Sequence, residues 1–210
     1  PEVFFHRDIL HCPEPDARLV TGIKRDISLL ARLQGCSGSR ITVLDISLDC
    51  NRKELQSLLA TGNAVFYADH HFSGTIPDSP LLEAHIDPSP HLCTSLIIDQ
   101  LLAGAFRPWA LVGAYGDNLD TVADSLAEAS GYSADERLAL REVGVLLNYN
   151  GYGSSAADLH MHPAELFREV HGYLEPMRFH AFSPVMDLLR RGYAQDLAHA
   201  ADLEPFHLPA

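Results

Sequence analysis

Three consecutive side chains with metal-binding groups, those of Asp69, His70 and His71, follow the apolar segment AVFYA at residues 64–68. Carboxylate oxygens and imidazole nitrogens together suit Mn²⁺, with Mg²⁺, Zn²⁺ and Fe²⁺ as further options. Neighbouring residues of a strand point to opposite faces, so both histidines can serve one site only if the chain turns there. Residues 72–74, Phe-Ser-Gly, are of types that allow such a turn.

Two further carboxylates occupy comparable places in the chain. Asp45 lies near the end of ITVLDIS (41–47), a segment of strand length, and precedes Asp69 by 24 residues, about one strand–helix–strand crossover. Ligands of open parallel sheets bind beyond the carboxyl ends of the strands, so these residues are expected at one edge. Asp117 and Asn118 follow another apolar segment, which would deliver a third carboxylate to that edge.

A carboxylate shared by two divalent cations would hold them roughly 3.5–4 Å apart, the spacing that activates a water against a phosphorus centre. Taken singly, an aspartate at a strand end is more often a turn or capping residue, and adjacent histidines are often an ordinary polar turn. The coincidence of several such residues at strand ends is what favours a metal site.

The elements that must position these residues are predicted from hydrophobic spacing. Uninterrupted apolar segments predict strands buried on both faces, and spacings of three or four residues predict helices. Their alternation predicts an α/β fold with a doubly wound parallel sheet and helices on both faces. Strands are expected at 17–23, 41–47, 64–68 and 83–87, and helices at 25–34, 51–62, 93–104 and 109–117. Asn51 can cap the helix at 51–62, and Thr94 or Ser95 lies near the cap of the helix at 93–104.

The character of the chain changes after about residue 120. Residues 1–120 are the predicted α/β domain that carries the metal site, and residues 121–210 are a smaller portion with helical patterns. This helical portion is expected to pack on the first domain or to link it to a domain absent from this chain. The segment NYNGYG (148–153) is interpreted as a turn rather than a phosphate loop.

The composition of the 210-residue chain limits the kinds of partner and the cellular compartment that are expected. Fifteen basic residues against 28 acidic ones give a formal charge of −13, which disfavours a long nucleic acid and is explained most simply by solubility. Four scattered cysteines without a CxxC pair are typical of a reducing compartment. There is no apolar run of transmembrane length and no signal-peptide pattern, so no membrane contact and a cytoplasmic location are expected.

At residues 69–71 the chain resembles the motif that names the DHH phosphoesterase superfamily. The similarity extends to Asp45, to the helix start Cys93-Thr94-Ser95 and to Gly116-Asp117-Asn118, which resembles the fourth motif. It covers about residues 17–120. The resemblance implies hydrolysis of phosphate esters or anhydrides with two metal ions, usually Mn²⁺.

The resemblance also implies a role for each matching residue. Asp45 is similar to the carboxylate that bridges both metals, and His70 and Asp117 resemble ligands of one metal. His71 resembles the histidine that contacts the substrate phosphate. Asp69 resembles a residue that orients the site through a hydrogen bond to a histidine or to a bound water.

The chain departs from the superfamily at the first motif, where an Asp-x-Asp usually supplies ligands to both metals. Here the segment EVFF is followed by His6-Arg7-Asp8, so Asp8 is the one carboxylate available as a metal ligand there. A complete site predicts two ions. A degenerate one favours the alternative of a DHH-fold module that binds a nucleotide or a single metal without hydrolysis.

Two cations are candidates for substrate binding. Lys24 and Arg25 follow the predicted strand at 17–23 and would face the same edge, where they could hold a phosphate, although a solvated pair opening a helix fits equally well. Asn118 is a third candidate for substrate binding.

The sequence therefore predicts a Mn²⁺- or Mg²⁺-dependent phosphoesterase that hydrolyses a small phosphorylated substrate, such as a short oligonucleotide or nucleotide. This prediction is compatible with a homodimer. A dinucleotide-binding oxidoreductase is disfavoured because no GxGxxG follows an early strand.

Overall fold

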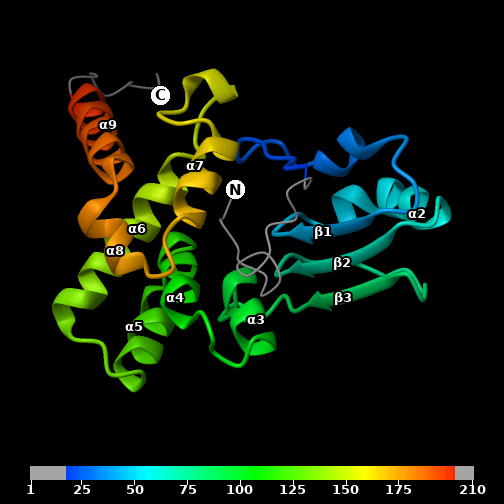
Figure 1. The fold of residues 1–210 in the computed structure, drawn as a ribbon, viewed down its shortest axis with the longest axis horizontal. Helices are drawn as coiled ribbons and strands as arrows, with labels where there is room; N and C mark the ends of the chain where they lie inside the picture. The colour runs from blue at the N-terminus through cyan, green and yellow to red at the C-terminus, as the bar shows by residue number, and fades with distance from the viewer. Residues whose placement is uncertain (1–17, 202–210) are drawn as a thin grey trace, which may run out of the picture.

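The computed structural model describes residues 18–201 and shows a mixed α/β protein with one three-stranded parallel sheet and a set of packed helices (Figure 1). In chain order the elements are η1 (Leu29–Leu33), β1 (Arg40–Leu44), η2 (Asp49–Asn51), α2 (Arg52–Ala60), β2 (Ala64–Asp69), β3 (Leu82–Ile86), α3 (Thr94–Leu101), α4 (Arg107–Gly116), α5 (Asp120–Ala129), α6 (Ala134–Tyr149), η3 (Ala156–Asp158), α7 (Pro163–His171), α8 (Pro176–Phe182) and α9 (Pro184–Ala201).

The sheet has the order β1-β2-β3, and both neighbouring pairs are parallel. Val43 lies opposite Tyr67 in the first pair, and Asp69 lies opposite Ile86 in the second. All three carboxyl ends point toward the helical part of the molecule (Figure 1). The sheet is therefore parallel as predicted, while the doubly wound arrangement with helices on both faces stays a prediction.

One face of the sheet carries the smaller of the two hydrophobic clusters among the described residues. Side chains of one parity on the strands, including Val43, Val65 and Tyr67, pack against Leu55 and Leu58 of α2. The spacing of Leu55, Leu58 and Leu59 puts three apolar residues on one side of that helix, which is why α2 covers the strands that flank it in the sequence.

The prediction of a strand at 17–23 is wrong for the described residues 18–23, which have no regular secondary structure. The helix predicted at 25–34 is reduced to the 3₁₀ helix η1. Asn51 explains part of this difference, because its side chain does not cap α2 as expected. Instead its amide accepts from the N–H of Leu30 at 3.3 Å and donates to the carbonyl of Ile27 at 2.6 Å, which fixes the short helix to the start of α2.

The larger hydrophobic cluster begins before residue 120 and lies in the helical part. It joins Cys93 and Leu96 of the α3 region and most of α4 to buried residues of α6, α8 and α9. Helices α4 and α6 approach closely because glycines face one another: a Cβ built on Gly116 would lie 3.0 Å from the carbonyl oxygen of Gly144. This crossing fixes the carboxyl end of α4, and with it Asp117, relative to the helical part.

Candidate metal centre

Asp45 follows β1 in a left-handed backbone conformation, with φ at +59°, that a non-glycine residue rarely adopts. Its N–H donates to the carbonyl of Ala68 at 3.0 Å, and the hydroxyl of Tyr67 donates to the carbonyl of Ile46 at 2.6 Å. The hydroxyl of Thr94 donates to Asp45 Oδ1 at 2.7 Å. These bonds hold the Asp45 carboxylate beyond the sheet edge at the cost of a strained backbone, a combination that is concentrated at functional sites.

His70 lies between two carboxylates. Its Nε2 is 3.4 Å from Asp45 Oδ1, and its Nδ1 is 3.7 Å from Asp117 Oδ2 and 3.2 Å from the carbonyl oxygen of Leu92. A proton on Nδ1 would be donated to that carbonyl, which leaves the lone pair of Nε2 pointing toward Asp45. Such a carbonyl contact is the usual way in which the tautomer and ring orientation of a metal-binding histidine are set.

His71 forms a tight pair with Asp69, whose carboxylate Oδ1 lies 2.6 Å from His71 Nδ1. The Asp69 side chain is fully buried, and its Oδ2 has no hydrogen-bond partner among the described residues. The hydrogen bond to Asp69 raises the pKa of His71 above its usual value, more than partial burial lowers it. Because Nδ1 is held by Asp69, Nε2 is the nitrogen left to face a ligand.

The two adjacent histidines do lie together, since β2 ends at Asp69 and the chain bends directly after it. Their ring centroids are 4.5 Å apart in an edge-on arrangement. The following loop is held by Arg52, whose guanidinium donates to the carbonyls of Ser73 and Thr75 and to Asp49 Oδ1 at 3.0 Å. The turn that the two histidines require is thus fixed from α2.

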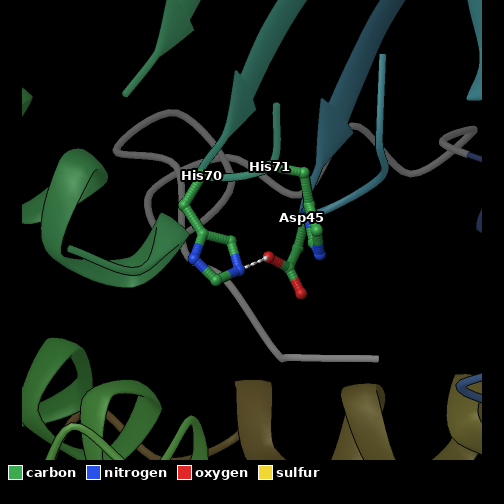
Figure 2. Close-up of side chains that lie close together, drawn as sticks. All are labelled: Asp45, His70 and His71. Atoms are coloured by element: carbon green, nitrogen blue, oxygen red, sulfur yellow. Dashed lines mark ion pairs between the residues drawn. The ribbon is translucent and has the colours of Figure 1, made fainter. Parts of the chain in front are cut away.

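Asp45, His70 and His71 each offer one ligand atom, and these atoms lie within 4.8 Å of one another. Figure 2 shows the three side chains gathered beyond the ends of the two strands that carry them. Two opposite ligands of one ion at about 2.2 Å are separated by about 4.4 Å, so the spacing is comparable with that of a first coordination shell. One carboxylate and two imidazoles suit Mn²⁺, Fe²⁺ or Zn²⁺.

Asp117 caps the carboxyl end of α4 and completes the acidic surroundings. Burial raises the pKa of its carboxyl above the usual value, and the negative charge of Asp45 raises it further. His70 and Lys24 act in the opposite direction. Negative charge is therefore crowded at this edge, and a bound cation would relieve that repulsion.

The remaining predicted site residues are Asp8, Lys24, Arg25 and Asn118. Asp8 falls outside the described residues. Arg25 is exposed in a turn, and Asn118 is exposed with a left-handed backbone, its N–H donating to the carbonyl of Tyr115. No contact of either side chain with the cluster is seen within residues 18–201. Lys24 is close enough to act on the Asp117 carboxyl, so it lies near the site.

Two contributions to the site were not assigned from the sequence. The side chain of Thr94 was expected only to cap a helix, but its hydroxyl binds Asp45 and makes no capping bond. The position of Thr94 at a helix start is a signal for either role, so sequence alone does not separate them. The contact of Leu92 with His70 uses a backbone carbonyl, which any residue would supply.

No family model matches the chain, and neither the curated proteins nor the solved structures contain a significant match to it. In the part of the chain that the structure describes, every helix is too short or too polar to cross a membrane.

Proposed function

We propose that the protein is a metal-dependent phosphoesterase that acts on a small phosphorylated substrate at the carboxyl edge of the sheet. One observation supports this most directly: the potential ligand atoms of Asp45, His70 and His71 lie within 4.8 Å of one another, and the buried carboxylate of Asp69 contacts His71 Nδ1 at 2.6 Å. A site built only for stability would pair a carboxylate such as Asp45 with an arginine or lysine. Within residues 18–201 Asp45 has no such ion pair, and its carboxylate contacts Nε2 of His70 and the hydroxyl of Thr94 instead.

Each residue has a distinct task in this proposal. Asp45 and Nε2 of His70 bind the cation, and Leu92 and Thr94 hold these two ligands in place. When bound, a divalent cation would polarise a phosphoryl oxygen and lower the pKa of a water molecule. Asp69 orients the imidazole of His71 and favours its protonated form, so that Nε2 can donate to a phosphoryl oxygen.

The charge of the chain narrows the substrate class. A formal charge of −13 repels a long polyanion, whereas a short phosphorylated molecule can be neutralised locally by bound cations. A short oligonucleotide or a nucleotide meets this condition. Mn²⁺ or Mg²⁺ is the proposed cofactor, in two copies if a second ion is held between Asp45 and Asp117.

A second candidate function is a module that binds one metal or a nucleotide without hydrolysing it. The geometry that favours it is the orientation of His70, whose Nε2 faces Asp45 while Nδ1 faces Asp117. With the proton on Nδ1, His70 can bind an ion only through Nε2, on the side of Asp45, and cannot bind a second ion on the side of Asp117. The described residues therefore provide one compact ligand set, and Asp117 lies beside it.

The two candidates separate in an experiment with Mn²⁺ and bis(p-nitrophenyl) phosphate, a minimal phosphodiester. Parent protein should release p-nitrophenol in a Mn²⁺-dependent manner, and Asp45→Asn should reduce turnover by more than about 100-fold. Removing only an outer partner of a ligand usually costs about 10–100-fold, and Asp45 is proposed as a ligand itself. Asp135→Asn, an exposed carboxylate in the first turn of α6, is the matched control and should retain parental turnover.

Metal content measured on the same preparations completes the design. Turnover in the parent and equal turnover in Asp45→Asn would contradict the metal-binding role. An inactive parent that retains one tightly bound metal ion would favour the binding module.

A further inference from the structure

Lys24 is a cation placed near the candidate site without a carboxylate partner among the described residues. Six arginines in residues 18–201 are paired with carboxylates: Arg32, Arg52, Arg107, Arg137, Arg141 and Arg190. The ammonium of Lys24 instead contacts Tyr152, whose hydroxyl lies 3.2 Å from Nζ. In a chain with a formal charge of −13, an ammonium left without a carboxylate is available to an anion.

The backbone fixes Lys24 in this place. Its N–H donates to the carbonyl of Gly151 at 3.0 Å, which joins the first described segment of the chain to the loop after α6. Figure 1 shows these two segments, blue and yellow-green, side by side at the boundary between sheet and helices. A contact between segments 127 residues apart is a built feature of the fold, and it brings a cation to the edge at which Asp117 lies.

Tyr152 is placed next to the same edge by α6. The last turn of that helix packs on the end of α4, where a Cβ built on Gly116 would lie 3.5 Å from Cβ of Asn148. The backbone then turns, with the N–H of Gly151 donating to Asn148 and that of Tyr152 donating to Tyr149. Asn148 thus packs against Gly116, the residue directly before Asp117. Tyr152 follows Asn148 by four residues, about one helical turn.

Tyr152 is 57% exposed although it is a large aromatic residue. The Lys24 ammonium lies 4.8 Å from its ring centroid, so cation and ring form one surface unit. An exposed ring beside a cation offers two different contacts to a nucleotide: stacking for the base and charge for the phosphate. A phosphorylated sugar without a base could use only the second.

We propose that Lys24 and Tyr152 form a nucleotide-recognition subsite, in which the ammonium binds a substrate phosphate and the tyrosine ring stacks on the base. This inference rests on the proposed function only in taking the phosphorylated ligand to occupy the same edge of the sheet. It makes the substrate class more specific, a nucleotide or short oligonucleotide rather than any small phosphate ester. It also gives the segment that follows α6, where the sequence predicted only a turn, a role in binding.

The test is equilibrium binding by titration calorimetry, which requires no turnover. The ligands are 5′-AMP and ribose 5-phosphate in the presence of Mn²⁺, with the integrity of each ligand checked by chromatography. The parent should bind 5′-AMP about tenfold more tightly than ribose 5-phosphate, since stacking on an aromatic side chain is typically worth that factor or more. Lys24→Gln should weaken both ligands by a similar factor, because both carry the phosphate.

Two variants at position 152 separate the ring from its hydroxyl. Tyr152→Leu should abolish the preference for 5′-AMP and leave ribose 5-phosphate binding nearly unchanged, whereas Tyr152→Phe should keep most of the preference. Arg191→Gln removes one positive charge from an exposed position on α9 and is the control for net charge, expected to match the parent. The exposure of Tyr152 makes misfolding of these variants a minor concern, and a thermal melt of each confirms the fold.

The outcomes distinguish this inference from the proposed function. The expected pattern in a protein that hydrolyses nothing would support the subsite and contradict hydrolysis. Mn²⁺-dependent turnover with no preference for 5′-AMP, or with unchanged binding in Lys24→Gln and Tyr152→Leu, would overturn the subsite alone. Equal losses in Lys24→Gln and Arg191→Gln would show a general effect of charge and would also overturn it.

Discussion

Histidine and carboxylate side chains meet both at the sheet edge and between the helices, and the two regions handle charge in opposite ways. Between the helices, Arg190 of α9 binds Glu142 of α6 in a bidentate pair, with two N–O distances of 2.8 Å, and His180 of α8 lies 2.6 Å from Glu142 Oε2. The hydrogen bonds from Arg190 lower the pKa of Glu142 to about 2. This cluster contains its own cation.

At the sheet edge no arginine or lysine is ion-paired with Asp45 or Asp117 within residues 18–201, and burial raises the pKa of Asp117. The difference is what the proposed function requires, with the helical cluster serving the fold and the sheet-edge cluster serving a ligand. A cluster that holds helices together supplies its own neutralising charge. In a cluster that must accept a cation, no arginine or lysine neutralises the carboxylates, so their mutual repulsion persists in the metal-free fold.

The largest effect is expected where the two regions are joined, at the crossing of α4 and α6. Gly144→Ala would place a methyl group against the carbonyl of Val112, 2.8 Å from the nitrogen of Gly116 and 3.1 Å from Cβ of Tyr115. These are mostly backbone atoms, so the helices must separate, at a cost of about 2–4 kcal/mol in the free energy of unfolding. Chemical denaturation measures this loss.

The same substitution should weaken Mn²⁺ binding, because separating the helices moves Asp117 at the end of α4. Gly172→Ala, where the built Cβ lies 3.2 Å from one carbonyl at the end of α7, is the milder control. If Gly144→Ala destabilised the protein yet left Mn²⁺ affinity unchanged, the helical part would not position the site.

Much of this division was predictable from particular residues. The apolar segments ending at Asp45 and Asp69 predicted two parallel strands with their polar ends at one edge, because short segments that are apolar throughout are typical of strands in parallel sheets. The tight turn at 70–74 followed from the need of two adjacent histidines to face one site. These features depend on local pattern, which a single sequence displays.

Other features depend on partners distant in the sequence and could not be predicted from it. Residues 18–23 looked like a strand but are held as an irregular segment, in part by the bond from Lys24 to Gly151. Asn51 looked like a helix cap but binds Ile27 and Leu30 instead. In each case a tertiary contact outweighs a local preference of less than about 1–2 kcal/mol.

The helical cluster should contribute stability in a pH-dependent manner that Glu142→Gln removes. Because its pKa is about 2 in the fold against 4.5 in the unfolded chain, ionised Glu142 stabilises the fold fully above about pH 4.5. That contribution is lost as the pH falls through the folded pKa. Glu142→Gln should therefore cost roughly 1–2 kcal/mol at pH 7, a value reduced because the side chain is 40% exposed.

Urea denaturation of parent and Glu142→Gln at pH 7, 4.5 and 2.5 measures this effect, and the difference between them should shrink at the lowest pH. Mn²⁺ affinity at pH 7 should be the same in both proteins. A pH-independent difference would mean that Glu142 acts through packing rather than through its charge.

The smallest effect has the opposite sign and is expected at Asp117. The pKa of Asp117 is raised in the fold, so the neutral carboxyl is the form that stabilises the folded state. This stabilisation is present below the unfolded pKa of 3.8 and is lost as the pH rises through the folded pKa. Ionised Asp117 therefore carries a penalty at pH 7 in the metal-free protein. Asp117→Asn should raise the stability of the EDTA-treated protein by up to about 1 kcal/mol at pH 7, and the gain should disappear below about pH 3.8.

Addition of Mn²⁺ should reverse the order of the two proteins. A ligand stabilises the fold according to its affinity, so the parent should gain more in thermal midpoint than Asp117→Asn, which has lost one negative charge beside the ion. Glu142→Gln is the natural comparison, since it should be less stable than the parent with EDTA and with Mn²⁺ alike. A carboxylate that is kept for a cation should destabilise the metal-free fold, so its removal should raise the thermal midpoint in EDTA. A lower midpoint for Asp117→Asn than for the parent in EDTA would instead show that Asp117, like Glu142, stabilises the fold.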